Sequence, residues 1–257
     1  MNNKTLTLLA LAALSAGSLS ARGEYDEIAR LQAMNERVQG IRSMADGEHY
    51  TTLENNDIRR YAYATDSEGV SLLPSPAPNL AISDYAFSPD ERMILIASGR
   101  TPIYRHSYTT QYHLLADGRI RPVLQEAEAP RDASFSPDGR KIAYSDRNDL
   151  YVWDIATGKT QRITDDGAWN AVINGTTDWV YEEEFGTTRA YAFSPDGGQL
   201  AFLRFDESEV PLMEMMRFDG KLYNEAYSFK YPKAGEKNSA VQLWVADLAT
   251  GRKHRID

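Results

Sequence analysis

Ser134-Phe135-Ser136-Pro137-Asp138-Gly139 is the stretch that decides the fold, because the chain contains it three times. The other copies are Ala86-Phe87-Ser88-Pro89-Asp90 and Ala192-Phe193-Ser194-Pro195-Asp196-Gly197. Proline fixes φ at the first corner of a β-turn, aspartate accepts local backbone hydrogen bonds, and glycine closes the turn without steric cost. We therefore expect the three serines of these copies to be structural.

The spacing of the turns indicates a structural repeat. Pro89 and Pro137 are 48 residues apart, and Pro137 and Pro195 are 58 residues apart. An apolar run follows each turn, and we expect these runs to be the inner strands of the repeats: Met93–Ala97, Ile142–Tyr144 and Leu200–Leu203. Repeats of about 40 to 50 residues with several strands each are typical of β-propeller blades.

A second repeated stretch supports the same interpretation. Its copies are Val152-Trp153-Asp154-Ile155-Ala156-Thr157-Gly158-Lys159 and Val245-Ala246-Asp247-Leu248-Ala249-Thr250-Gly251-Arg252. From Tyr50 onward, short runs rich in Val, Ile, Tyr, Phe and Trp are cut by Gly, Pro, Asp and Asn, which is typical of a meander of strands. The sequence therefore predicts an all-β fold in which residues 49–257 form part of a β-propeller, about four blades in number.

The N-terminus has the layout of a secretory signal peptide. Lys4 precedes an apolar run from Leu6 to Leu14, and small residues follow as far as Ala21. We expect residues 1–21 to be cleaved and the protein to be secreted or periplasmic in a bacterium. The apolar run is shorter than the roughly 20 residues that a membrane span needs, although an uncleaved anchor remains the alternative.

Residues 22–48 are predicted to form an N-terminal helical segment. Apolar residues recur there at helical spacing: Ile28, Leu31, Met34, Val38 and Ile41. We expect one amphipathic helix from Glu24 to Arg42, ahead of the strands.

Composition narrows the possible functions. The formal net charge is −9 and no dense basic cluster occurs, which argues against nucleic acid as a partner. There is no cysteine, and the four histidines lack the spacing of zinc ligands, so we expect neither a metal nor another cofactor. An acidic cavity would instead attract cationic ligands.

The most distinctive block of the chain is Asp178-Trp179-Val180-Tyr181-Glu182-Glu183-Glu184. Successive helical residues lie about 100° apart, so adjacent glutamates can converge on one ligand only in a helix or tight turn. Asp178 is a suitable N-cap for such a helix, and the positive end of the helix dipole favours the three carboxylates. The block therefore indicates a cation site, and its alternative is an ordinary solvated helix start.

Three further stretches extend this block into a family resemblance. They are Arg105-His106-Ser107-Tyr108-Thr109, Phe205-Asp206-Glu207-Ser208-Glu209-Val210-Pro211-Leu212 and Tyr231-Pro232-Lys233-Ala234-Gly235. Together with the glutamate block, a helical insert near 178–188, they resemble the propeller domain of the dipeptidyl peptidase IV group of the prolyl oligopeptidase family. The matches run from about Ala86 to Leu248.

The resemblance implies an eight-bladed propeller joined to an α/β-hydrolase domain that carries a catalytic Ser, Asp and His. No Gly-x-Ser-x-Gly elbow occurs in the 257 residues, so we expect no catalytic residue in this chain. We interpret it as the N-terminal portion of a longer serine exopeptidase, inactive by itself, that releases Xaa-Pro or Xaa-Ala dipeptides. The other hypothesis is a non-catalytic propeller module that binds peptide N-termini or other cations.

The same resemblance implies roles for particular residues. Glu183 and Glu184 are expected to bind the α-ammonium of a peptide substrate with a free N-terminus, and Arg105 a backbone carbonyl of that substrate. Glu182 is expected to be structural, and Asp206, Glu207 and Glu209 to lie in a solvated loop. A stretch from Met216 to Lys233 matches a family segment that projects from the propeller, which implies a possible homodimer.

Overall fold

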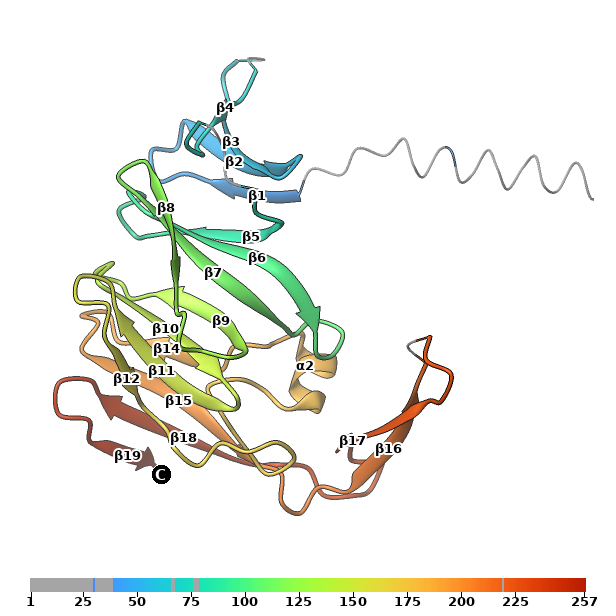
Figure 1. The fold of residues 1–257 in the computed structure, drawn as a ribbon. Coiled ribbons are helices and arrows are strands. Elements are labelled where there is room, and N and C mark those ends of the chain that lie inside the picture. The colour runs from blue at the N-terminus through green and yellow to red at the C-terminus, as the bar shows by residue number, and fades with distance from the viewer. Residues whose placement is uncertain (1–29, 31–38, 66–67, 76–78, 219) are drawn as a thin grey trace, which may run out of the picture.

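Four antiparallel sheets follow one another along the chain and are arranged side by side as the blades of a partial β-propeller (Figure 1). This computed structural model describes residue 30 and residues 39–65, 68–75, 79–218 and 220–257. The all-β, partial-propeller prediction is therefore confirmed. In the described part of the chain, no helix has the length and apolar character needed to cross a membrane.

The blades are built in chain order. The first contains β1 (Gln39–Ser43), β2 (His49–Glu54), β3 (Asp57–Ala62) and β4 (Val70–Ser71). The second contains β5 (Ile82–Phe87), β6 (Ile94–Pro102), β7 (Tyr108–Ala116) and β8 (Arg119–Val123). The third contains β9 (Pro130–Phe135), β10 (Lys141–Asp146), β11 (Asp149–Asp154) and β12 (Thr160–Arg162). The fourth contains β13 (Val172–Asn174), β14 (Tyr191–Phe193), β15 (Gln199–Asp206), β18 (Ala240–Asp247) and β19 (Lys253–Ile256).

The repeated Ser-Pro-Asp stretches are the turns between the first two strands of the last three blades. In the third blade, Ser136 Oγ donates to Asp138 Oδ1 (2.5 Å) and accepts from the backbone N–H of Lys141 (2.9 Å). The serines of the other two copies make the corresponding contacts. Their structural role is thus confirmed. The apolar runs after the turns form the second strands of these blades, β6, β10 and β15. Each turn connects the first strand of its blade to this second strand.

The fourth blade departs from this pattern twice. Its first strand is split into β13 and β14, which both pair with β15, and the intervening residues leave the sheet to form helix α2 (Trp179–Phe185). The backbone closes this excursion where Ala190 N–H donates to Gly175 C=O (2.9 Å). A hairpin, β16 (Leu212–Arg217) and β17 (Glu225–Lys230), is inserted between β15 and β18 and projects from the blades (Figure 1). The helical insert accounts for the longer second spacing.

The hydrophobic core lies between neighbouring blades. Each seam has its own cluster: Ile58, Leu73, Tyr85 and Ile96 between blades one and two; Leu95, Leu114, Ile142 and Trp153 between two and three; Leu150, Ile163, Leu200 and Phe202 between three and four. Because the chain has no cysteine, this inter-blade packing and the strand pairing hold the fold together.

The prediction of an N-terminal helix from Glu24 to Arg42 is wrong at the C-terminal end of that range. Residues Gln39–Ser43, which include Arg42, form β1 and pair with β2. Gly40 has a φ of 63°, a left-handed conformation that ends a helix and accommodates the irregular register of this pair. Arg30 is helical, but the signal peptide (residues 1–21) and most of the predicted helix lie outside the described residues.

Candidate functional site

Helix α2 forms where the sequence predicts it. Asp178 is its N-cap, with extended backbone, and its Oδ1 accepts from the N–H of Tyr181 (2.9 Å). Gly186 ends the helix in a left-handed conformation, and its N–H donates to Glu182 C=O (3.0 Å). Both caps fix the short helix at the inner strand of the fourth blade.

The three adjacent glutamates lie in three different environments. Glu182 is 1% exposed, and its Oε1 accepts from the consecutive backbone N–H groups of His106 and Ser107, both at 2.7 Å. Glu183 forms an ion pair with Arg105, whose Nε lies 2.9 Å from Oε2 and 3.3 Å from Oε1. Glu184 is exposed to solvent. The predicted set is therefore brought together in part: Arg105 and Glu183 are in contact, and Glu184 adds a free carboxylate one position along the helix.

The loop that carries Arg105 joins β6 to β7 in the second blade. It is closed by a hydrogen bond from Ile103 N–H to Ser107 C=O (2.9 Å). Its attachment to α2 goes through Glu182, because the backbone on the C-terminal side of Arg105 donates to that carboxylate. Arg105 itself is 71% exposed, whereas the Glu183 side chain is only 16% exposed. The guanidinium of Arg105 therefore faces solvent, whereas the hydrogen bonds that hold its loop to α2 are buried.

A cavity of about 470 Å³ lies beside this pair. Residues from both segments line it, with His106 and Ser107 on one side and Gly186 to Arg189 on the other. The inner strands of blades two and three supply Asp84 and Asp132. Both carboxylates are paired, Asp84 with Arg42 (2.7 Å) and Asp132 with Arg131 (3.4 Å), and Arg189 also lines the cavity.

Aromatic side chains support α2 from beneath. Tyr181 packs edge-to-face on Phe205, with ring centroids 5.0 Å apart, and Trp179 packs on Tyr231 at 4.4 Å. Tyr104, next to Arg105, contacts Phe229 of the hairpin at 5.8 Å. The hairpin, the helix and the arginine loop thus pack on one aromatic cluster, which we call the aromatic base. It contains Tyr104, Trp179, Tyr181, Phe205, Phe229 and Tyr231, and Trp179 and Tyr181 serve packing in it.

Glu207 contradicts the prediction of a solvated loop. It follows β15, is only 6% exposed, and lies among groups of the same aromatic base. Burial is the main cause that raises the pKa of Glu207 to about 7, and the nearby Asp178 raises it further. Burial likewise raises the pKa of Tyr104 above its ordinary value. Asp206 is also outside the predicted loop, because it is the half-buried last residue of β15, and of the three only Glu209 is exposed as predicted.

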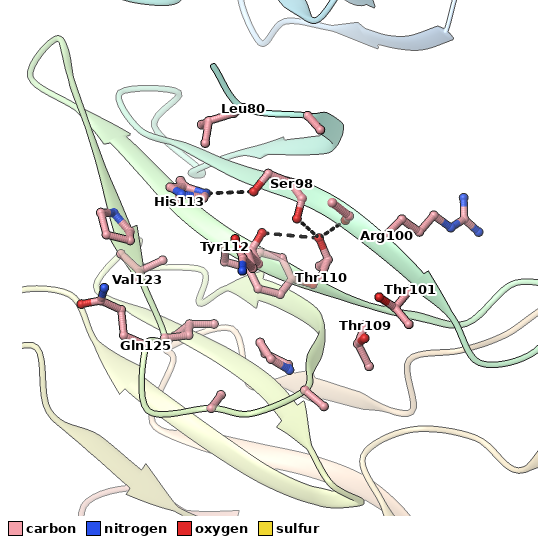
Figure 2. Close-up of a pocket in the computed structure, with 18 of the residues that line it drawn as sticks. Leu80, Ser98, Arg100, Thr101, Thr109, Thr110, Tyr112, His113, Val123 and Gln125 are labelled. Atoms are coloured by element: carbon pink, nitrogen blue, oxygen red, sulfur yellow. Dashed lines mark hydrogen bonds between the residues drawn. The ribbon is translucent and has the colours of Figure 1, made fainter. Parts of the chain in front are cut away.

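A second cleft, of about 680 Å³, lies between blades two and three (Figure 2), and neither Arg105 nor α2 lines it. Hydroxyl and amide groups of β6 and β7 line it, and Ser98 Oγ and His113 Nδ1 are hydrogen-bonded there at 3.2 Å. None of the predicted site residues reaches it. Among the described residues, no group of three or more acidic or histidine side chains is placed to hold a metal ion.

Comparison with known proteins places this arrangement in a family. The family profile described as the dipeptidyl peptidase IV N-terminal region matches residues 88–257. The chain belongs to this family. The match includes Arg105, all of α2 and the projecting hairpin, so the site described above lies within the dipeptidyl peptidase IV region.

Individual relatives agree. The chain is 35% identical over 225 residues to dipeptidyl peptidase 4 of Trichophyton rubrum, and 36% identical over 215 residues to dipeptidyl peptidase 4 of Sus scrofa. The crystal structure of Porphyromonas gingivalis dipeptidyl peptidase 4 matches 86% of the chain with a TM-score of 0.80 and 38% identity. The matched region covers 33% of that structure's chain and 28% of each of the two curated relatives.

Proposed function

We propose that this chain is the substrate-gating propeller part of a secreted or periplasmic dipeptidyl peptidase IV-like serine exopeptidase that releases Xaa-Pro or Xaa-Ala dipeptides. Glu183 and Glu184 bind the α-ammonium of the peptide, and Arg105 binds a backbone carbonyl. The observation that carries the proposal is the Arg105–Glu183 ion pair, formed by segments 78 positions apart and joined beneath by the buried Glu182.

The charges suit a peptide N-terminus. An ammonium offers three donors and one positive charge, which two carboxylates can satisfy through charge-assisted hydrogen bonds. Arg105 neutralises one of the two carboxylates in advance, so the three side chains of Arg105, Glu183 and Glu184 together keep a net charge of about −1. A monovalent cation completes this balance.

Anchoring the amine also determines where a peptide is cut. If the α-ammonium is held at a fixed distance from a catalytic serine in the hydrolase domain of the longer protein, the second peptide bond reaches the nucleophile. Arg105 fixes the orientation of the same short segment, since a guanidinium donates from a rigid plane. The product is then a dipeptide.

Residues 1–21 are the signal peptide in this proposal and are removed on export. The support is their sequence pattern of a basic residue, an apolar run and small residues. The partner besides peptide substrates is a second copy of the protein. The projecting hairpin supports this, because its tip exposes Phe218, Leu222 and Tyr223.

Peptide binding tests the amine anchor directly. A short Ala-Pro peptide and its N-acetylated form are titrated against the chain, and we expect only the free amine to bind at the site.

In the enzyme with its hydrolase domain, Glu183→Ala and Glu184→Ala should each lower kcat/KM for an Xaa-Pro substrate by about 100-fold or more, because the scissile bond loses its alignment. Glu209→Ala is the matched control, since Glu209 is an exposed glutamate paired with Lys237. Unchanged turnover in both site variants would remove the anchor role, and amine binding without turnover in the wild type would favour the non-catalytic alternative.

A further inference from the structure

The first strand of the third blade is irregular where it lines the site cavity. In β9, Asp132 and Ala133 together oppose a single residue of β10, Tyr144, so the strand contains a β-bulge. Asp132 has a φ of 55°, a left-handed conformation that is unfavourable for a residue with a Cβ. Bulges and left-handed non-glycine residues occur preferentially beside functional sites, and Asp132 lines the cavity next to the Arg105–Glu183 pair.

The first blade has the same backbone feature with a different residue. Gly40 of β1 lies at an irregular register with β2 and has a φ of 63°, and its C=O accepts from the hydroxyl of Tyr85 in the next blade. The C=O of Asp132 accepts from the hydroxyl of Tyr191 in the same way. Glycine adopts this backbone without steric cost. Blade three thus keeps a side chain where the backbone favours glycine, which indicates a role for the carboxylate itself.

The carboxylate of Asp132 joins two segments of the chain. Its Oδ1 accepts from Thr188 Oγ1 at 2.6 Å, and its Oδ2 lies 3.4 Å from Arg131 Nε. The side chains of Asp132 and Arg131 are only 15% and 11% exposed, so water competes little for either contact. A hydroxyl that donates to a charged acceptor forms one of the stronger hydrogen bonds in proteins. Arg131 therefore neutralises the carboxylate while Thr188 attaches a distant segment to it.

Thr188 belongs to the support of α2. The segments 174–178 and 186–190, which connect α2 to the fourth blade, are joined by backbone hydrogen bonds, and we call them the stalk. Across the stalk, Thr177 N–H donates to Thr188 C=O (3.1 Å). Asp178, the N-cap of α2, follows Thr177 directly. A single backbone hydrogen bond thus separates the residue held by blade three from the segment that begins the helix.

Helix α2 depends on such attachments because it has only seven residues. Glu182 attaches it to the second blade through the arginine loop, and Asp132 attaches its stalk to the third blade. Both contacts come from blades other than the one that carries the helix. The orientation of Glu183 and Glu184 is therefore set by blades two and three as well as by blade four.

We propose that Asp132 is a positioning residue for the amine site, which acts through Thr188 on the stalk and thereby orients Glu183 and Glu184. The inference deepens the proposed function, on which its meaning for peptide binding rests. Loss of the bond between Asp132 and Thr188 leaves the blades folded and lets α2 move relative to Arg105.

Amide hydrogen exchange without any peptide tests the inference. Thr188→Val removes the hydroxyl and keeps the shape of the side chain. Protection of the Thr177 and Tyr181 amides should then fall about tenfold, the effect of one hydrogen bond to a charged acceptor. The amide of Ile163, which donates to Leu150 C=O at the end of β12 (2.8 Å), should keep its protection.

Thr187→Val is the matched control for this substitution. Thr187 is exposed, and its hydroxyl makes only a 3.4 Å contact with Phe185 C=O. Its replacement should leave the protection of both stalk and helix amides as in the wild type.

Substitutions at Asp132 identify the group that acts. Asp132→Gly suits the left-handed backbone and removes the carboxylate, so it should lower protection at Tyr181 as much as Thr188→Val does. Asp132→Asn keeps an acceptor oxygen and should remain within about threefold of the wild type. A double variant with Asp132→Gly and Thr188→Val should lose no more than either alone, because both changes remove the same bond.

Two results would overturn the inference. One is unchanged protection in Thr188→Val, which decides the matter by itself if Asp132→Gly fails to fold. The other is a loss in the double variant that equals the sum of the two single losses, since the two residues would then act independently.

Titration of a free-amine Ala-Pro peptide against the same variants separates this inference from the proposed function. The peptide should bind Thr188→Val and Asp132→Gly about tenfold more weakly than the wild type, and should bind Thr187→Val as it binds the wild type. If α2 loosens in Thr188→Val and the peptide does not bind even the wild type, the proposed function fails while the attachment by Asp132 stands. If the peptide binds the wild type and Thr188→Val equally well, the amine anchor stands and the inference fails.

Discussion

At the scale of single residues, the site depends on three neighbouring glutamates with unequal tasks. A helix turns about 100° per residue, so Glu182, Glu183 and Glu184 cannot share one environment. The first is buried against backbone N–H groups, the second pairs with Arg105, and the third faces solvent. The cation binding that we propose for the last two therefore depends on the first, which fixes the helix to the arginine loop.

The contribution of Glu182 can be measured by two substitutions. Glu182→Leu removes the acceptor and leaves the N–H groups of His106 and Ser107 buried and unsatisfied, which should cost about 2–4 kcal/mol of unfolding free energy. Glu182→Gln keeps an acceptor oxygen without its charge and should cost about 1 kcal/mol. Urea unfolding gives both values, with exposed Glu184→Gln as a control within about 0.5 kcal/mol of wild type. A Glu182→Leu protein as stable as wild type would mean that the attachment contributes nothing.

The sequence alone predicted structure where the residues that determine it are adjacent in the chain. Asp178, the aromatic residues and the glutamates form one block, so its helix and N-cap could be predicted. Glu207 could not be assigned, because its burial arises from tertiary packing that no local pattern of the sequence indicates. That Arg105 and Glu183 belong to one site was expected from the resemblance alone, since no local pattern spans 78 residues.

At the scale of elements, one turn recurs because it satisfies its polar groups internally. The serine hydroxyl and the aspartate carboxylate bond to each other and to the following backbone N–H groups. The corner residue is left-handed in all three copies, with φ of 57° at Glu91, 68° at Gly139 and 69° at Gly197. The repeat was therefore visible in sequence, whereas the exchange of helix for strand at residues 39–43 depended on pairing with β2.

Gly139 provides a test of this turn. A Cβ added there would meet Pro89 Cδ at 3.7 Å, an ordinary contact, so Gly139→Ala should lose only the energy of a left-handed alanine, about 1 kcal/mol. Gly198→Ala is the matched control, because Gly198 follows the equivalent turn without a positive φ. Thermal unfolding should place Gly139→Ala below that control. Equal stability of the two variants would show that the corner carries no strain.

At the scale of the whole molecule, the blades are joined by a tyrosine that precedes the repeated turn. The hydroxyl groups of Tyr85 and Tyr191 donate to Gly40 C=O and Asp132 C=O of the preceding blade. Blade three has Ala133 at this position, and its N–H donates instead to the hydroxyl of Tyr112 from β7 (3.1 Å). The cleft and the site cavity lie on either side of this seam and have Tyr112 in common. Blades two and three are therefore joined through Tyr112 of the second blade rather than through a tyrosine of the third.

The exposed apolar tip of the hairpin β16–β17 is the feature on which the proposed dimer rests. A two-stranded hairpin is marginally stable by itself, and this one exposes Leu222 and Tyr223 at 91% and 82%. If a second copy covers the tip, Leu222→Asp with Tyr223→Asp should raise the dimer dissociation constant by about 100-fold or more, since burial of two such side chains contributes about 3 kcal/mol. Sedimentation over a concentration series measures the constant. Ile256→Asp, which changes an exposed apolar side chain on β19, is the control and should leave association unchanged. Dissociation by Ile256→Asp but not by the hairpin variant would assign association to the open face of the fourth blade instead.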